Sequence, residues 1–144
     1  MQAKPYIRYL FVIVFLAFVF NKIYLRTWVL EHELGAFFEM IVYSIPNFFE
    51  AILGTIVATA ISLSLKDAFR HKVKDALVYP ISLSFASIYV ITQELKLHNL
   101  GGNNVYDVND LMASVIGLIL MASLFFTCGF RKKEPTIASR NRIH

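Results

Sequence analysis

The 144-residue chain is too apolar for an ordinary soluble protein, since 57% of its residues are hydrophobic, 17% are charged and its mean hydropathy is +0.58. Soluble domains are about 45–50% apolar and about 25% charged, so this composition disfavours a soluble domain and excludes a disordered or collagen-like chain. The net charge of +4 does not indicate nucleic-acid binding, because the basic residues lie beside apolar segments. We therefore expect the lipid bilayer, and no nucleic acid, as the partner of this chain.

Four apolar segments near twenty residues long account for the excess of hydrophobic residues. Each is about long enough for an α-helix to cross a hydrocarbon core of roughly 30 Å, and together they leave too few residues for a separate soluble domain. The segments lie at about 7–25, 46–65, 77–93 and 111–130. The sequence thus predicts an all-α polytopic membrane protein, with a four-transmembrane-helix bundle in residues 1–130 and a basic cytoplasmic tail in residues 131–144.

The first segment follows Lys4 and Arg8, as the apolar part of a signal peptide would. It lacks the small-residue cleavage pattern of a signal peptide, so we interpret it as an uncleaved anchor. Residues 31–45, before the second segment, are apolar but contain Glu31, Glu33 and Glu39. We interpret them as a short interfacial helix, with a helical extension of either neighbouring segment as the alternative.

Lysine and arginine residues near the segment ends predict the orientation of the chain. In a four-span arrangement Lys22, Arg26 and Lys96 lie on one side, and the other eleven of the fourteen basic residues lie on the opposite side. Because the basic side is the cytoplasmic one, both termini are expected in the cytoplasm and the connection between the third and fourth segments outside it. This arrangement fits a multi-pass protein of the cell membrane.

Three carboxylates lie around the third connection, on the predicted outer side. Glu94 ends the third segment, where the helix dipole disfavours a carboxylate by roughly 0.3–1 kcal/mol. A cationic partner, a bound ion, a raised pKa or simple exposure to headgroups and water could compensate it. Asp107 and Asp110 form a D-x-x-D pair, which can hold a divalent cation or divide acid and base roles. Asp110 is also well placed to cap the fourth helix.

Glu50 is the fourth candidate, because it would lie about one turn below the outer surface if the second helix starts at Pro46. An ionisable group at that depth is costly and indicates a site, with snorkelling to the interface as the alternative. We therefore predict an outward-facing ligand site formed by Glu50, Glu94, Asp107 and Asp110. No Walker loop, Rossmann fingerprint or zinc-ligand spacing identifies a cofactor, a metal or a catalytic residue.

Pairs of small residues four positions apart occur in three of the segments. Such pairs let helix backbones approach closely in lipid, so they predict packing faces, either within the bundle or between copies in a homo-oligomer. The pairs are Gly54 with Ala58, Ser82 with Ala86, and Ala113 with Gly117.

The residues from Glu94 onward resemble the signature of VanZ-like membrane proteins. In that pattern a helix-terminal glutamate precedes an aromatic-Asp-x-x-Asp-Leu-x-Ala-Asn-x-x-Gly run that opens the last helix. Residues 44–49 are similar to the proline-containing entry of an earlier helix in some members, and the resemblance covers about half of the chain, from about residue 45 to 120. The strongest matches are Glu94, Asp107, Asp110, Leu111, Ala113 and Gly117, whereas Leu97, Asn104 and Ser114 depart from the pattern.

The resemblance implies a bacterial cytoplasmic-membrane protein with a role in the cell envelope. The family takes its name from a protein associated with glycopeptide resistance, and most members have no assigned activity. The leading hypothesis is that the outer carboxylates bind a polar or lipid-linked envelope component or a cation. The alternatives are a small transporter or channel subunit with Glu50 in an oligomeric pathway, a membrane enzyme with Glu94 or an aspartate as acid or base, and a structural accessory subunit.

Overall fold

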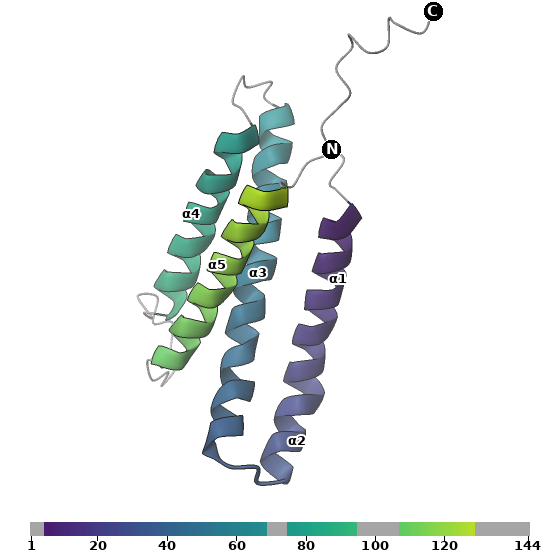
Figure 1. Ribbon diagram of the computed structural model, residues 1–144, viewed down its shortest axis with the longest axis vertical. Coiled ribbons are helices and arrows are strands. Elements are labelled where there is room, and N and C mark those ends of the chain that lie inside the picture. The colour runs from purple at the N-terminus through teal and green to yellow at the C-terminus, as the bar shows by residue number, and fades with distance from the viewer. Residues whose placement is uncertain (1–4, 69–74, 95–106, 129–144) are drawn as a thin grey trace, which may run out of the picture.

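The computed structural model describes residues 5–68, 75–94 and 107–128, and the regular elements in these ranges are all helices. The predicted all-α class is therefore confirmed. The predicted basic tail and the connection that contains Lys96 lie outside the described residues. The elements are α1 (Pro5–Phe20), the π-helical segment η1 (Asn21–Leu25), α2 (Arg26–Glu31), α3 (Ala36–Ala68), α4 (Asp75–Glu94) and α5 (Val108–Cys128) (Figure 1).

The first three elements follow one another without a break and form one rod of 27 residues, Pro5–Glu31. Pro5 suits the first turn of this rod, because its missing N–H would have no helical partner there. The rod ends in a tight turn in which Glu33 and Gly35 have positive φ values of 47° and 96°. Glycine reaches a φ of 96° without strain, so Gly35 permits the chain to reverse into α3.

α3 begins ten residues before the start predicted at Pro46 and continues for 33 residues, a length of about 50 Å. Residues 36–45 form the first turns of α3, so the described residues contain no separate interfacial helix. The segment is a helical extension of the second span, which is the alternative considered above. Pro46 removes one backbone hydrogen bond inside the helix, a loss that packing of α3 against its neighbours offsets.

Three helices are long and apolar enough to cross a membrane: Pro5–Glu31, Ala36–Ala68 and Val108–Cys128. α4 adds a shorter apolar segment, Leu77–Gln93. The chain is therefore a helical membrane protein by the length and composition of its described helices.

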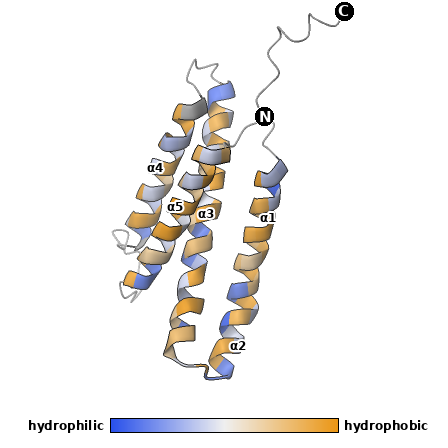
Figure 2. Cartoon of the chain, viewed as in Figure 1, coloured by the Kyte–Doolittle hydropathy of each residue, from blue (hydrophilic) through white to orange (hydrophobic). Residues whose placement is uncertain are grey.

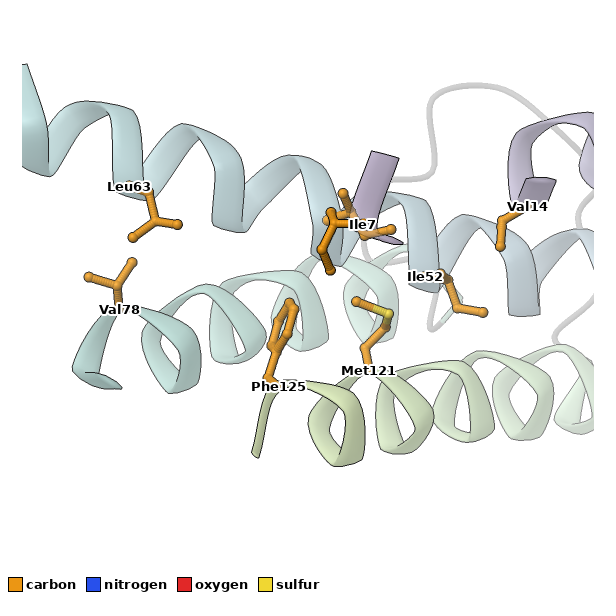
Figure 3. Close-up of a cluster of buried hydrophobic side chains, with 8 residues drawn as sticks. Ile7, Val14, Ile52, Leu63, Val78, Met121 and Phe125 are labelled. Atoms are coloured by element: carbon orange, nitrogen blue, oxygen red, sulfur yellow. The ribbon is translucent and has the colours of Figure 1, made fainter. Parts of the chain in front are cut away.

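α3 is the central helix, because α1, α4 and α5 each pack against it, and α4 also packs against α5 (Figure 1). Figure 3 shows Met121 and Phe125 pointing from α5 toward α3. The start of α1 and the end of α5 lie at the same end of the bundle, and α5 runs in the same direction as α3 but starts partway along it (Figure 1). The main buried cluster consists of Ile7, Val14, Ile52, Ile56, Leu63, Val78, Met121 and Phe125.

The outer faces of the helices are apolar, as a bilayer requires, and several buried positions are polar. Ile23 and Phe126 are 72% and 79% exposed, and Figure 2 shows hydrophobic residues along most of the length of α1, α3 and α5. Inside the bundle the Thr55 and Thr59 hydroxyls donate to backbone carbonyls one turn earlier, at 2.7 and 2.8 Å. Such bonds satisfy hydroxyls locally where no water is present.

The predicted small-residue pairs occupy different environments. A Cβ added at Gly117 would lie 2.7 Å from the Phe48 carbonyl oxygen and 3.1 Å from the Ala51 Cβ, so α5 approaches α3 closely at this glycine. Ala113, one turn earlier, is half-buried. Ser82 and Ala86 of α4 are both buried. Gly54 has no other side chain or helix within 4 Å of an added Cβ, and Ala58 is half-buried.

Candidate functional site

Asp107 is the N-cap of α5. Its Oδ1 accepts hydrogen bonds from the Asn109 backbone N–H at 2.8 Å and from Asn109 Nδ2 at 2.9 Å. Its carbonyl accepts a hydrogen bond from the Leu111 N–H at 3.3 Å. The sequence assigned this capping role to Asp110, which was wrong because α5 starts at Val108, before the apolar run that marked its expected start.

Asp110 therefore lies inside the first turn of α5, where the helix dipole favours a carboxylate. Its Oδ1 is buried and has no hydrogen-bond partner among the described residues. An unsatisfied buried carboxylate oxygen is unfavourable, so this atom indicates a position where a further hydrogen-bond donor can bind.

Ser44 of α3 has the same unsatisfied character. It is only 8% exposed, and its hydroxyl has no partner among the described residues, unlike the Thr55 and Thr59 hydroxyls further along α3. The Ser114 hydroxyl donates to the Asn47 carbonyl at 3.5 Å, which aligns α5 with α3. Asp110 lies one turn before Ser114, and Ser44 lies about one turn before Asn47. The same alignment therefore places Asp110 and Ser44 at about the same level along the two helices.

An apolar groove lies between residues 40–48 of α3 and the first two turns of α5, and Ser44 is among its lining residues. Its volume is about 300 Å³, at the lower end of the range for small-molecule sites. Ser44 and Asn109 are its polar residues. The groove is lined by Met40, Ile41, Ser44, Ile45 and Phe48 of α3 and by Asn109, Met112, Ala113 and Ile116 of α5.

Glu50 does not line this groove. It is exposed on α3 and shares a helix face with Val57 and Ile61, which are 44% and 54% exposed. Because α3 starts at Ala36, Glu50 lies about 21 Å along the helix axis instead of in its first turn. The structure thus places Glu50 apart from Asp110 and Ser44.

Glu94 is the last residue of α4, but its side chain lies outside the described part of the chain. The prediction that it approaches Asp107 and Asp110 therefore stays a prediction. Within the described residues, no group of three or more His, Cys, Asp or Glu side chains could hold a metal ion.

Sequence reasoning missed the roles of Ser44 and Asn21. Asn21 lies in η1, is 2% exposed, and neither its Oδ1 nor its Nδ2 has a partner in the described structure. Both residues interrupt apolar runs. A serine or an asparagine is common in a membrane helix, however, and the sequence pattern does not show which of these side chains lack a hydrogen-bond partner. The Arg26 guanidinium lies 4.0 Å from the centroid of the Tyr43 ring.

Comparisons with protein-family models, with curated proteins and with solved structures found no match to this chain. The VanZ-like resemblance therefore stays a prediction from the sequence pattern. Of its strongest matches, Asp107 caps α5, the Asp110 Oδ1 is buried without a partner among the described residues, and Gly117 lies where α5 approaches α3 closely.

Proposed function

We propose that this chain is a VanZ-like integral membrane protein of the cell envelope that binds a polar envelope component at the outer end of its helices. Asp110 is the main binding group. The observation that supports this role is the buried Asp110 Oδ1, which has no partner among the described residues although Asp107 already caps α5. The Asp110 carboxylate is therefore not needed to cap the helix.

The proposal includes a four-span topology with both termini in the cytoplasm. The segregation of basic residues supports it. The start of α1 and the end of α5 lie at one end of the molecule, which also supports this topology (Figure 1). In this orientation the turn before α3, the start of α5 and the groove face the outer side, where envelope components are present.

The chemistry of the site limits the ligand. An ionised carboxylate accepts hydrogen bonds, so Asp110 requires a group with N–H or O–H donors, such as an ammonium or a hydroxyl. The Ser44 hydroxyl can donate to an oxygen of the same ligand. Binding requires only these two groups, whereas catalysis would also need a nucleophile and a base in contact.

The test is complementation of a strain that lacks the gene, grown under cell-envelope stress. Asp110→Asn should abolish rescue while leaving the amount of protein in the membrane unchanged, because it removes the charge but keeps the shape of the side chain. Asp107→Asn is the matched control and should rescue fully, since asparagine caps helices as well as aspartate does. Full rescue by the Asp110→Asn variant would contradict the proposal.

A further inference from the structure

We propose that two copies of this chain form a parallel dimer in the membrane, in which Glu50 of each copy forms an ion pair with Lys22 of the other copy. The contact surface is the side of α3 that carries Glu50, together with the adjoining side of the rod Pro5–Glu31. Copies that share one topology lie parallel whichever side they face, so the dimer does not depend on the proposed function.

Both charged residues lie within the hydrocarbon core of the membrane. α3 is about 50 Å long and Glu50 lies about 21 Å from its start, so any stretch of roughly 30 Å that crosses the hydrocarbon includes Glu50. The rod is about 40 Å long and Lys22 lies about 26 Å from its start, so the same holds for Lys22. A charge at such a depth is costly unless it has a partner of opposite charge.

Neither charge has such a partner among the described residues of its own chain. Glu50 is exposed and forms no ion pair or hydrogen bond with a described residue. Lys22 is also exposed, and its ammonium lies 5.4 Å from the centroid of the Phe18 ring without an ion pair to a described carboxylate. A second copy of the chain carries the counterion that each of the two residues requires.

Glu50 and Lys22 lie on the same side of the molecule. The rod and α3 run side by side and are joined by one tight turn (Figure 1). The Arg26 guanidinium lies 4.0 Å from the centroid of the Tyr43 ring, so this side of the rod meets the Tyr43 side of α3. Glu50 lies two turns after Tyr43 on that side of α3, and Lys22 lies about one turn before Arg26 on that side of the rod.

The two charges also lie at about the same depth. Phe18, beside the Lys22 ammonium, is 13 residues before the end of the rod at Glu31. Glu50 is 14 residues after the start of α3 at Ala36. These counts correspond to about 20 and 21 Å of helix axis from the two ends of the turn.

A two-fold axis along the membrane normal therefore brings opposite charges together. Such an axis keeps every residue at its depth and turns the same side of each copy toward the other. Glu50 of the first copy then meets Lys22 of the second, and Lys22 of the first meets Glu50 of the second. Each copy keeps its own groove between α3 and α5, because the groove is lined by other residues of α3.

The rest of this side of α3 suits helix contact in lipid, where small residues let backbones approach and polar contacts hold helices together. Gly54 lies one turn after Glu50, and a Cβ added there would have no side chain and no other helix within 4 Å. Val57 and Ile61 continue the same side and are exposed. A neighbouring copy can therefore pack against α3 without displacing any part of the chain.

The test is energy transfer between full-length copies in lipid vesicles, labelled with a donor or an acceptor dye at Cys128, the single cysteine of the chain. The wild type should associate. Lys22→Glu alone, and Glu50→Lys alone, should each weaken self-association by a factor of about ten or more, because like charges then meet twice. An equal mixture of the two variants should associate as the wild type does, since one variant carries two acids and the other two bases.

The mixture separates pairing between copies from pairing within one chain. If Lys22 and Glu50 paired within the chain, mixing the two variants would restore nothing, and that result would overturn the dimer. A wild type that stays monomeric at every protein-to-lipid ratio would overturn it as well.

Gly54→Trp tests the same surface without a change of charge, in case the charge-reversed variants do not insert. The tryptophan meets nothing within the chain near its Cβ, so the variant should fold but remain monomeric. Ile119→Trp is the matched control, because Ile119 is 60% exposed on α5 and should leave the dimer intact. Wild-type association of the Gly54→Trp variant would contradict the proposed surface.

Discussion

Asn21 is the most deeply buried polar side chain without a partner in the described structure. It is 2% exposed, and its amide group makes no hydrogen bond through either Oδ1 or Nδ2. A buried amide without hydrogen bonds costs roughly 1–3 kcal/mol, and it lies in the π-helical segment η1. π-Helical segments are often found at functional sites.

We therefore expect Asn21→Leu to raise the unfolding temperature of the protein in detergent micelles, because leucine has a similar branched shape and no polar atoms. Asn109→Leu is the control and should lower the unfolding temperature, since it removes the hydrogen bond that Asn109 Nδ2 donates to the Asp107 Oδ1. Differential scanning fluorimetry measures both. A lower unfolding temperature for Asn21→Leu would show that the amide has a partner outside the described residues.

Asp107 and Asp110 show how far the sequence alone could predict the start of α5. The sequence identified both as important residues at the start of α5. It exchanged their roles because the apolar run from Leu111 suggested a later helix start than Val108. A polar first turn has no hydrophobic periodicity, so only the hydrogen bonds to Asp107 locate the cap.

At the scale of helices, the contact between α3 and α5 depends on Gly117. An alanine there would place its Cβ 2.7 Å from the Phe48 carbonyl oxygen, and backbone atoms cannot move aside as a flexible side chain can. Gly54 is the other glycine in a predicted small-residue pair. A Cβ added at Gly54 would have no side chain and no other helix within 4 Å. The two glycines thus offer a matched comparison of a packed and an unpacked position.

Gly117→Ala should destabilise the protein by about 1–3 kcal/mol, because it forces α3 and α5 apart. Gly54→Ala should be neutral or stabilising by up to about 1 kcal/mol, since alanine favours the helix. Titration of the refolded protein with a denaturing detergent, followed by circular dichroism, measures the two free energies of unfolding. Equal effects of the two variants would contradict the close approach at Gly117.

Helix positions were more predictable than helix boundaries. The apolar segments at 7–25, 46–65, 77–93 and 111–130 all fall largely on observed helices. The start of α3 was missed because Pro46 favours a first helical turn, and the acidic residues before it resembled an interfacial segment. Burial of Val42 and Ser44 in the bundle, which helps to keep residues 36–45 on α3, depends on neighbouring helices that the local sequence does not specify.

At the scale of the whole molecule, the structure separates two kinds of carboxylate. The Asp110 Oδ1 is buried in the first turn of α5, whereas Glu50 lies on an exposed face of α3 with Val57 and Ile61. A transport pathway around Glu50 would require another copy of the chain to cover that face. The groove needs no further subunit, so it supports a binding role for a single copy.

The proposed binding site depends on an orientation that places the turn before α3 outside and the end of α5 inside. Cys128 is the single cysteine of the chain, it ends α5 and it is exposed, so it reports on the proposed cytoplasmic side. Glu33 is exposed in the turn before α3 and reports on the other side. The Glu33→Cys substitution in a Cys128→Ser background therefore provides a cysteine that reports on the proposed outer side.

Labelling of intact cells with a membrane-impermeant maleimide tests this orientation directly. The proposed topology predicts that the Glu33→Cys variant in the Cys128→Ser background is labelled in intact cells. It also predicts that the wild-type chain, through Cys128, is labelled only after the membrane has been permeabilised. Labelling of Cys128 in intact cells, with protection of the cysteine at position 33 until permeabilisation, would place the groove on the cytoplasmic side and contradict the proposal.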